Sequence, residues 1–476
     1  MKALIAVAAL LLGAAAGCGG SSGGWPQPNL DESSTRAVSG PIDAGDVGRL
    51  HLVWRFRIPT PPGASGAMTA TPVIAGGVVY VQDMKSNVFA LELATGHVRW
   101  RRSFQESTPG PNGLAVADGR VYGVTDAAAF ALSAKTGRVL WSTLLVRPTE
   151  QFVETAPLAT GGRVYVSTIG LPPNGKGALY EIDARTGAVD WRFGTIERPW
   201  RVPSEAGGGG AWYPPSVAGD TVYWGTTNPY PYGGTRRHPN GGAYAGPALY
   251  TDSLLALRAR SGTLEWYDQV TSHDVRDYDF QLPPVLAGRL VVGAGKAGRV
   301  IAWDRYTRAR AWIATVGVHR NDTGPLPLRR VPICPGLLGG VETPMAYAHG
   351  VVFVPIVDLC MRGGARGYVP LSDVDVMRGR GELVALDAKT GRRLWSDRLA
   401  RPVFGCATVS NDVVFTSTFD GMLIGVDARD GHRLVTRRLD AGINACPAVA
   451  HGTIVVPAGV PVHAGQTADV EAFTTG

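Results

Sequence analysis

Residues 384–395 read VALDAKTGRRLW, and close copies of this stretch recur along the chain. Each copy has a short run of alternating apolar and polar residues, then Thr-Gly or a related pair, and then a large apolar residue. Six copies end in a tryptophan, at Trp100, Trp141, Trp191, Trp266, Trp312 and Trp395. A seventh copy, IGVDARDGHRLV, ends in Val435 instead, and Trp54 stands alone before the first complete copy. Self-similarity of this period is typical of propellers and related arrays.

Each repeat has the pattern of a small antiparallel sheet. Alternation of apolar and polar residues, as in VFALEL, is typical of half-buried strands. The Thr-Gly or Ser-Gly pair supplies a residue that can adopt positive φ, so the chain can reverse tightly. The tryptophan that follows is large enough to fill the wedge between neighbouring sheets. One such sheet cannot bury both of its faces, and a closed ring of stacked copies leaves only short, protected edges.

Seven copies predict seven sheets, and Trp54 together with the C-terminal segments TIVVPAG and DVEAFTT predicts an eighth. We therefore expect an all-β fold over residues 45–476: an eight-bladed β-propeller of four-stranded antiparallel blades, with tryptophan-docking repeats, closed by pairing of the N- and C-terminal strands. Two smaller repeat domains fit less well, because nothing like a linker divides the array. The two longest intervals end at Trp266 and at Trp395, and we expect their extra residues in loops on the propeller faces.

The composition agrees with a turn-rich globular protein and excludes several classes. The 476 residues include 63 Gly and 34 Pro, 45% are hydrophobic and 18% are charged. That hydrophobic fraction is too high for a disordered chain. The net charge is +7, but the basic residues are scattered, whereas nucleic-acid binders gather them in a patch or stripe. We therefore expect no nucleic-acid partner.

The N-terminus resembles the leader of a bacterial lipoprotein. A lysine and an apolar stretch of signal-peptide length lead to small residues directly before Cys18. The resemblance implies a signal peptide over residues 1–17, lipid on Cys18, and a flexible linker that reaches to residue 44. An ordinary secretory signal with a chance cysteine is the alternative. We expect an extracytoplasmic protein, in the cell envelope or periplasm, that its lipid anchors to the bacterial membrane.

Four further cysteines are present, at Cys334, Cys360, Cys406 and Cys446. An even number in an exported protein permits two disulfides. We expect Cys334 to pair with Cys360 and Cys406 with Cys446, because each pair lies within one repeat or two adjacent ones. None of the spacings is typical of a zinc site.

The repeat ALDAxTGxxxW resembles that of β-propellers that bind pyrroloquinoline quinone (PQQ). It also occurs in lipoproteins of outer-membrane protein assembly, which bind no cofactor. Four successive segments are more specific, because they resemble signatures of PQQ-dependent alcohol dehydrogenases: VYWGTTNPYPYGG, ALYTDSLLALRARSGTLEW, SHDVRDYDF and LVVGAGKAGRVIAWDR, between residues 222 and 305. Upstream, GGGGAWYPPSV resembles the segment whose tryptophan lies flat under the cofactor.

The resemblance implies a role for each of five residues. Trp212 would be the platform for the quinone ring, and Lys296 would hydrogen-bond the quinone oxygens. Asn228 would give its side-chain oxygen to a metal, and Asp279 matches an acid that adds a lanthanide ligand in some members; Asn228 also begins an Asn-Pro pair that is a turn-former in its own right. Asp277 would be the general base that removes the alcohol proton. The implied cofactors are PQQ, as electron sink, and Ca²⁺ or a lanthanide, as Lewis acid.

Other parts of the resemblance fail. The expected metal-binding glutamate is absent, because Leu171 and Pro172 stand in that region and Glu181 lies further along the strand. Glu342 and Thr343 replace an Asn-Trp pair, the vicinal disulfide that covers the quinone is missing, and there is no CxxCH for a cytochrome domain. One half of the pocket therefore matches the family and the other half does not.

Two functions follow as hypotheses. The first is a lipid-anchored quinoprotein dehydrogenase that oxidises an alcohol-type substrate and passes electrons to a separate cytochrome or membrane acceptor. The second is a non-catalytic propeller scaffold with a vestigial pocket, which would bind envelope proteins. The segments between residues 222 and 305 favour the first, and the missing glutamate and cysteine pair favour the second.

Overall fold

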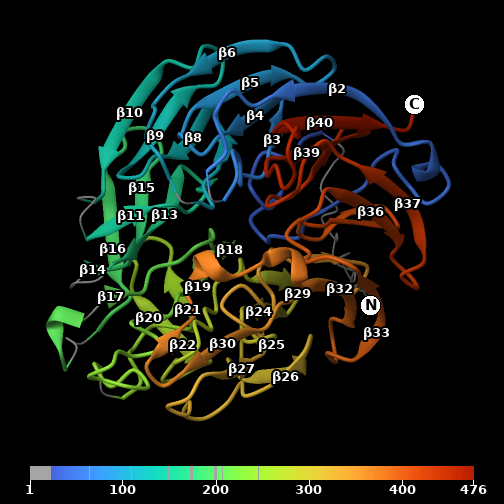
Figure 1. Cartoon of the computed structure of the whole chain (residues 1–476). Coiled ribbons are helices and arrows are strands. Elements are labelled where there is room, and N and C mark those ends of the chain that lie inside the picture. Colours follow the sequence, from blue (N-terminus) through green and yellow to red (C-terminus); the bar gives the residue numbers. More distant parts are fainter. Residues whose placement is uncertain are drawn as a thin grey trace, which may run out of the picture.

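The computed structural model describes residues 23–63, 65–108, 110–146, 150–171, 175–197, 201–205, 207–244 and 246–476. Nearly all of its regular structure is strand, which confirms the all-β prediction. Within these described residues, four single-turn 3₁₀ helices are present, at Val47–Arg49, Pro203–Glu205, Leu371–Asp373 and Val376–Arg378. Figure 1 shows the sheets following one another around a common centre in the order of the sequence.

Within the described residues, eight sheets share one plan, in which four antiparallel strands follow one another across the sheet. The first four sheets are β3 (Val73–Ala75), β4 (Val78–Gln82), β5 (Val88–Glu92) and β6 (Val98–Arg102); β7 (Leu114–Ala117), β8 (Arg120–Val124), β9 (Ala128–Ser133) and β10 (Val139–Leu144); β12 (Leu158–Thr160), β13 (Arg163–Gly170), β15 (Ala178–Asp183) and β16 (Val189–Gly194), with β11 (Gln151–Val153) also on β13; and β18 (Ser216–Ala218), β19 (Thr221–Gly225), β21 (Ser253–Arg258) and β22 (Leu264–Gln269).

The other four are β23 (Val285–Ala287), β24 (Leu290–Ala294), β25 (Arg299–Asp304) and β26 (Arg310–Thr315); β28 (Ala346–Ala348), β29 (Val351–Asp358), β32 (Arg380–Asp387) and β33 (Arg393–Leu399); β34 (Thr408–Ser410), β35 (Val413–Ser417), β36 (Met422–Asp427) and β37 (Arg433–Arg438), with β1 (Ala37–Val38) beside β34; and β38 (Ala448–Ala450), β39 (Thr453–Ala458), β40 (Asp469–Thr474) and β2 (His51–Arg57). In this last sheet β2 pairs antiparallel with β40, so an N-terminal strand completes the C-terminal sheet.

The repeat tryptophans lie on outer strands, and all but Trp266 dock by a hydrogen bond on the turn of the following sheet. The indole N–H of Trp100 donates to the Ala134 carbonyl at 2.9 Å, and its ring covers Gly137, whose φ is 69°. A Cβ at Gly137 would lie 2.5 Å from that ring, so glycine serves both the positive φ and the close packing. The same bond recurs from Trp54, Trp141, Trp191, Trp312 and Trp395. The predicted role of these tryptophans between sheets is confirmed.

The N-terminal segment is part of the folded domain and corrects the predicted linker. Trp25 and Arg36 are fully buried. Backbone groups of residues 25–36 hydrogen-bond in turn to the first strands of successive sheets: β3, β7, β18, β23, β28 and β34, while the Gln27 side chain bonds β12. Because this segment satisfies the inner edges of the sheets, the folded part begins well before residue 45.

The two long intervals fold as small additional sheets. The first contains β14 (Gly175–Lys176), β17 (Gly207–Gly208) and β20 (Pro229–Tyr230), and the second β27 (Val331–Ile333), β30 (Met361–Gly364) and β31 (Gly367–Tyr368). They meet where the ring of Tyr232 lies 5.8 Å from that of Tyr368 and where the Asn240 N–H donates to the Ala365 carbonyl at 2.7 Å.

Both disulfides have the predicted pairing, Cys334 with Cys360 and Cys406 with Cys446. The first joins the two segments of the second insertion, because Cys334 follows β27 and Cys360 precedes β30. The second joins the inner loops of two neighbouring sheets, because Cys406 precedes β34 and Cys446 precedes β38. Of the helices in the described residues, none is long and apolar enough to span a bilayer.

Candidate functional site

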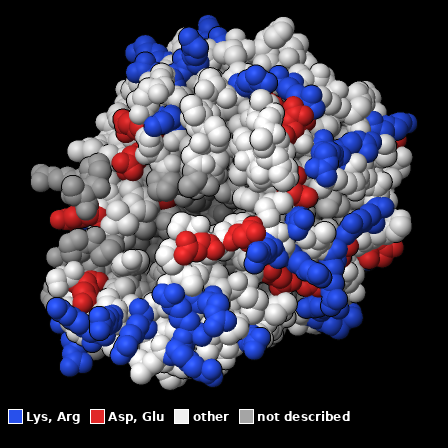
Figure 2. All heavy atoms as spheres, in the orientation of Figure 1, with Lys and Arg blue, Asp and Glu red and all other residues white. Residues whose placement is uncertain are grey.

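A cavity of about 220 Å³ lies where the inner loops of several sheets meet. Loops that precede the first strands supply most of its wall, so side chains distant in sequence share one space. The residues that line it include Asn29, Trp212, Gln281, Lys296, Glu342 and the Cys406–Cys446 pair. The face seen in Figure 2 is hollowed near its centre, and its Lys and Arg side chains gather mostly toward the rim.

Lys296 is the charged centre of one side of this cavity. It follows β24 and is buried, with its Nζ 2.8 Å from Asp277 Oδ2 and 2.7 Å from Asp279 Oδ2. Burial alone would lower the pKa of Lys296, but the nearby carboxylates of Asp277, Asp279 and Glu342 raise it well above its ordinary value. The ammonium is therefore charged and holds two carboxylates together.

Asp277 sits on a loop whose shape is fixed by Asp274. The Asp274 carboxylate accepts backbone N–H groups from Arg276 at 2.8 Å and Tyr278 at 2.6 Å, which makes a tight turn in which Asp277 has a φ of 66°. Burial raises the pKa of Asp277 to about 7, against the opposite effect of Lys296. A carboxyl with a pKa near neutrality can exchange a proton at physiological pH, as a general base must.

Trp212 and Asn228 are brought to the same carboxylate. The Asp279 carboxylate accepts the Trp212 indole N–H at 3.2 Å and the Asn228 backbone N–H at 2.6 Å. Trp212 lines the cavity, so this bond fixes the rotation of its ring in the wall. The Asn228 side-chain N–H donates to the Pro229 carbonyl at 3.0 Å, which leaves its amide oxygen for another partner. Asp279 thus orients both residues as well as neutralising Lys296.

Glu342 faces the cavity from the loop before β28. Its Oε2 accepts the Gln281 side-chain N–H at 3.0 Å, whereas its buried Oε1 has no hydrogen-bond partner. Burial raises the pKa of Glu342 to about 8, which outweighs the effect of nearby Lys296. The Thr343 hydroxyl beside it is also buried without a partner. Two neighbouring polar atoms are therefore open to a ligand.

The loop that carries Asp274, Asp277 and Asp279 is bonded to both insertions, and the Tyr244 hydroxyl of the first insertion donates to the Asp274 carbonyl. The Tyr368 hydroxyl donates to the Val275 carbonyl at 2.9 Å, and the Tyr278 hydroxyl donates to the Pro335 carbonyl at 3.2 Å. Deeper in the same region, neither carboxyl oxygen of fully buried Asp252 has a hydrogen-bond partner, and burial raises its pKa well above the ordinary value. The insertions therefore help to keep water from Asp277.

The family model for the glucose/ethanol/alcohol dehydrogenase beta-propeller domain, labelled PQQ, matches residues 25–115 and 146–302, just over half of the chain. The chain belongs to this family. A second model, for the outer membrane protein assembly factor BamB, matches residues 362–470. The first match includes all five residues to which the sequence assigned a role in the pocket.

Curated members of the family resemble this chain over part of their length. The dehydrogenase subunit of a quinone alcohol dehydrogenase of Gluconobacter oxydans is 29% identical over 308 residues, 55% of this chain and 39% of that protein. The quinohemoprotein alcohol dehydrogenase ADH IIB of Pseudomonas putida is 31% identical over 271 residues, 50% of this chain and 38% of that protein. The chain thus spans less than half the length of these relatives.

A solved structure of the same fold is a europium-containing methanol dehydrogenase. It superposes with a TM-score of 0.80 at 20% identity and covers 95% of this chain and 98% of its own. At that identity the likeness shows the fold alone. It agrees with a PQQ-type propeller as the architecture of this family member.

The structure brings together the five residues singled out in the sequence, around Lys296 and Asp279. Glu181 does not join them: it lies on β15 with its carboxylate 3.6 Å from Arg163, as its place along the strand suggested. Cys18 and Pro172 lie outside the described residues. Among the described residues, no three His, Cys, Asp or Glu side chains are grouped so that they could hold a metal ion.

Sequence reasoning missed two residues of the N-terminal segment, Asn29 and Arg36. Asn29 lines the cavity, and Arg36 lies directly behind it. Both fall in the stretch expected to be a linker. The available signal was Trp25, because a tryptophan in a supposed linker is more often a buried anchor.

Proposed function

We propose that this family member is a PQQ-dependent dehydrogenase that oxidises an alcohol-type substrate. The observation that supports it is that Trp212 and Lys296 line one cavity, and that Asp277, from a third loop, is ion-paired to Lys296 at 2.8 Å. A near-neutral carboxyl, a cation and an aromatic wall are what oxidation of an alcohol by a quinone requires.

The residues fit a cofactor of this kind. PQQ is a flat quinone that carries carboxylates, so it needs an aromatic face, a donor to its quinone oxygens and cationic groups for its acids. Trp212 provides the face, and Lys296 provides the donor and a positive charge. A second buried cation, Arg36, lies behind Asn29 in the cavity wall. When bound, PQQ would supply the electrophilic carbonyl and the electron sink.

The chain's own residues would then divide the work. Asp277 accepts the hydroxyl proton of the substrate, since its pKa of about 7 lets the ionised form be present at neutral pH. Lys296 keeps Asp277 in place and stabilises negative charge on the adjoining ligand. Asp279 fixes Trp212 and Lys296, and the cover formed by Tyr278 and Tyr368 keeps the proton transfer away from bulk water.

A metal ion would be bound by oxygen atoms close to Lys296. The carboxylate of Asp279 and the amide oxygen of Asn228 suit Ca²⁺ or a lanthanide, which prefer oxygen ligands. In this structure the Lys296 ammonium already neutralises Asp277 and Asp279, so a metal would compete with it. We therefore assign no chemical step to the metal.

The finer architecture and location belong to the same proposal. We infer that the eight four-stranded sheets form a closed ring, in which β2 paired with β40 joins the two ends. We also propose a lipid anchor at Cys18, an extracytoplasmic location, and a separate cytochrome or membrane component as electron acceptor. Two disulfides support the location, since disulfides persist in oxidising compartments.

The test is dye-linked oxidation of primary alcohols by protein reconstituted with PQQ and either Ca²⁺ or La³⁺. We expect turnover that Asp277→Asn lowers about 10²- to 10⁴-fold, the usual contribution of a general base. Asp373→Asn, on an exposed 3₁₀ turn, is the matched control and should keep full activity. Absence of turnover with PQQ, whichever metal is added, would overturn the proposal.

A further inference from the structure

Arg36 is an arginine whose side chain is fully buried in the N-terminal segment. Its guanidinium donates five hydrogen bonds to neutral acceptors. These acceptors are the carbonyls of Ala407 at 2.8 Å, Pro28 at 3.0 Å and Pro447 at 2.9 Å, the amide oxygen of Asn29 at 3.2 Å and the hydroxyl of Thr408 at 2.6 Å. The donors are therefore satisfied without any neutralisation of the charge.

No Asp or Glu in the part of the chain that the structure describes forms an ion pair with Arg36. Burial lowers the pKa of Arg36 to about 9. Its guanidinium also lies over the ring of Trp25, 5.2 Å from the centroid, which disperses the charge only weakly. A buried cation is costly unless an anion lies close by. The free protein thus keeps an uncompensated positive charge beside its cavity.

Asn29 connects this charge to the cavity. A guanidinium can only donate, so the Asn29 amide oxygen must face Arg36, and its NH₂ group must point the other way. Asn29 is 3% exposed and lines the cavity, and its NH₂ group donates to none of the described residues. It is a buried donor, set in one orientation by Arg36, that faces the cavity without a partner.

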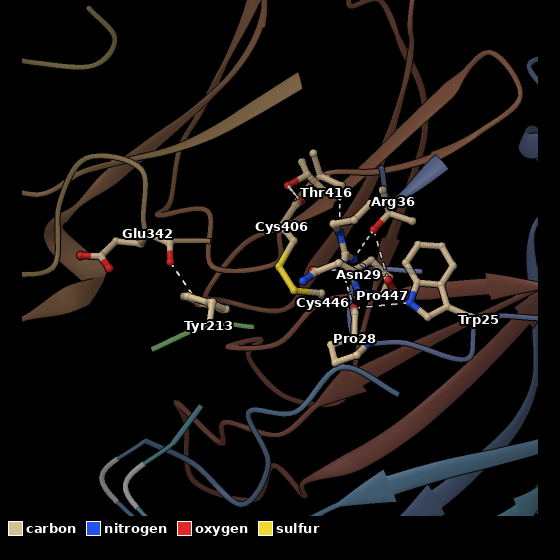
Figure 3. The surroundings of a disulfide bond; sticks show 12 residues. Trp25, Pro28, Asn29, Arg36, Tyr213, Glu342, Cys406, Thr416, Cys446 and Pro447 are labelled. Carbon is tan, nitrogen blue, oxygen red and sulfur yellow. Dashed lines mark hydrogen bonds between the residues drawn. A yellow bond between two sulfur atoms is a disulfide. The ribbon is translucent and has the colours of Figure 1, made fainter. Parts of the chain in front are cut away.

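The Cys406–Cys446 disulfide makes this arrangement rigid. Ala407 and Pro447, whose carbonyls accept from Arg36, directly follow the two cysteines. Figure 3 shows the guanidinium of Arg36, the side chain of Asn29 and the disulfide close together, with the Arg36 hydrogen bonds dashed. Both cysteines line the cavity, as Asn29 does. The donor is therefore held by the disulfide loops as well as by Arg36.

We propose that Asn29, oriented and polarised by Arg36, is an anion-binding residue of the cavity that receives a carboxylate of the bound cofactor. The assignment rests on the proposed function, which supplies the ligand class: a planar aromatic quinone with carboxylate groups. The carboxylate would accept the Asn29 N–H and neutralise Arg36 across the amide. Lys296 would act on the quinone oxygens, so two ends of the ligand would meet different cations.

The decisive variant is Asn29→Asp. Its carboxylate accepts from Arg36 as the amide oxygen does, but it also neutralises the charge and removes the donor. The free variant should therefore unfold at a higher temperature than the wild type. Its affinity for PQQ should fall by about 100-fold, because a charge-assisted hydrogen bond becomes a repulsion between carboxylates. A variant that is more stable but binds less cannot be explained by misfolding.

Asn444→Asp is the matched control. Asn444 also lines the cavity but makes no hydrogen bond to Arg36. The control adds the same charge to the same cavity, so it should weaken PQQ binding by less than about tenfold and should not raise the unfolding temperature. Equal effects of the two substitutions on stability and on binding would overturn the role of Arg36 and Asn29.

Neutral phenanthrenequinone separates this inference from the proposed function. Wild type should bind both quinones, and Asn29→Asp should lose PQQ while it keeps phenanthrenequinone. If Asn29→Asp bound PQQ as well as wild type does, the Asn29 assignment would be wrong although the proposed function could stand. If wild type bound neither quinone, the proposed function would fail.

Benzenetricarboxylate would then test whether Asn29 binds an anion. Thermal stabilisation of wild type but not of Asn29→Asp supports the anion site, and stabilisation of neither protein overturns it.

Discussion

Two buried cations adjoin the same cavity, and the protein treats them in opposite ways. Lys296 lies between two carboxylates at 2.7 and 2.8 Å, whereas Arg36 has five neutral acceptors and no acid. Burial raises the pKa of Tyr213, a residue of the cavity wall, and the positive charges of both side chains lower that pKa by less. Hydrogen-bond satisfaction and charge neutralisation are thus separate conditions. Arg36 has its hydrogen bonds satisfied but its charge is not neutralised. An anionic ligand therefore gains more binding free energy near Arg36 than near Lys296.

Loss of Arg36 should give the largest effect on stability. Arg36→Met leaves the buried Ala407 carbonyl and the Asn29 amide oxygen without donors. It also takes one of two donors from the Pro28 and Pro447 carbonyls, and we expect a loss of about 4 kcal/mol or more in the free energy of unfolding. Denaturant unfolding followed by tryptophan fluorescence measures it. Arg437→Met is the control: Arg437 also donates to carbonyls, those of Leu50 and Gly48, but it is partly exposed, so its loss should stay near or below about 1 kcal/mol. Equal losses would contradict the account of Arg36.

Loss of Lys296 should come next. Lys296→Met leaves Asp277 and Asp279 buried side by side without a cation, which should cost about 3 kcal/mol near neutral pH. Adding Asp277→Asn should recover part of this loss, because one of the two unpaired charges is removed. A double variant no more stable than Lys296→Met would show that the carboxylates are not held by the charge of Lys296.

Glu342 gives a pH dependence of known sign. Its pKa in the folded protein, about 8, lies above the ordinary value of 4.5, because burial outweighs the effect of Lys296, and Asp277, Asp279 and Tyr213 also lie within electrostatic reach. The unfolded chain releases this proton first, so stability falls as the pH rises from the ordinary value toward 8 and then levels off. Glu342→Gln should therefore stabilise the fold by on the order of 2 kcal/mol at about pH 8 and by little at about pH 5.

Thermal unfolding of wild type and Glu342→Gln across this pH range makes the comparison. The amide that replaces the carboxyl group keeps an oxygen that can accept from Gln281, so the hydrogen bond is conserved and only the ionisable group is lost. A difference between the two proteins that does not grow with pH would contradict a raised pKa for Glu342.

An exposed ion pair should give the smallest effect. Arg433 donates to both carboxylate oxygens of Asp397, at 2.7 and 2.9 Å, but its side chain is nearly half exposed. Arg433→Met should cost about 0.2–1 kcal/mol, the range for exposed pairs. Denaturant unfolding under the same conditions measures the free energy of unfolding of Arg433→Met and of Arg36→Met, so the two losses can be compared directly. A cost as large as that of Arg36 would mean that burial does not set these energies.

The repeat alone was enough to predict the architecture of the sheets. In most copies the tryptophan and the glycine act within a few residues of sequence and between adjacent sheets, as Trp100 on Gly137 shows. Such local, repeated contacts leave a periodic pattern. The same pattern places Cys406 and Cys446 at matching positions of neighbouring sheets, which is why their pairing could be predicted.

The cavity could be predicted only in part. Trp212, Asp277 and Lys296 carry signatures of the family in their own segments. Asn29 and Arg36 act through one long-range path from the N-terminal segment to the loops of Cys406 and Cys446, and Arg36 and Ala407 are 371 positions apart in the sequence. A contact made once across the whole chain leaves no periodicity, and the surrounding Pro, Ser and Gly residues have the composition of a linker.

Isothermal titration of PQQ into the wild-type protein, with Ca²⁺, La³⁺ or no metal, tests the central claim most directly. The account predicts saturable binding of a single equivalent, with loss of affinity in Asn29→Asp and in Lys296→Met, two residues of the cavity wall. Absence of binding at micromolar PQQ under all three conditions would contradict it and would show that the cavity does not serve this cofactor.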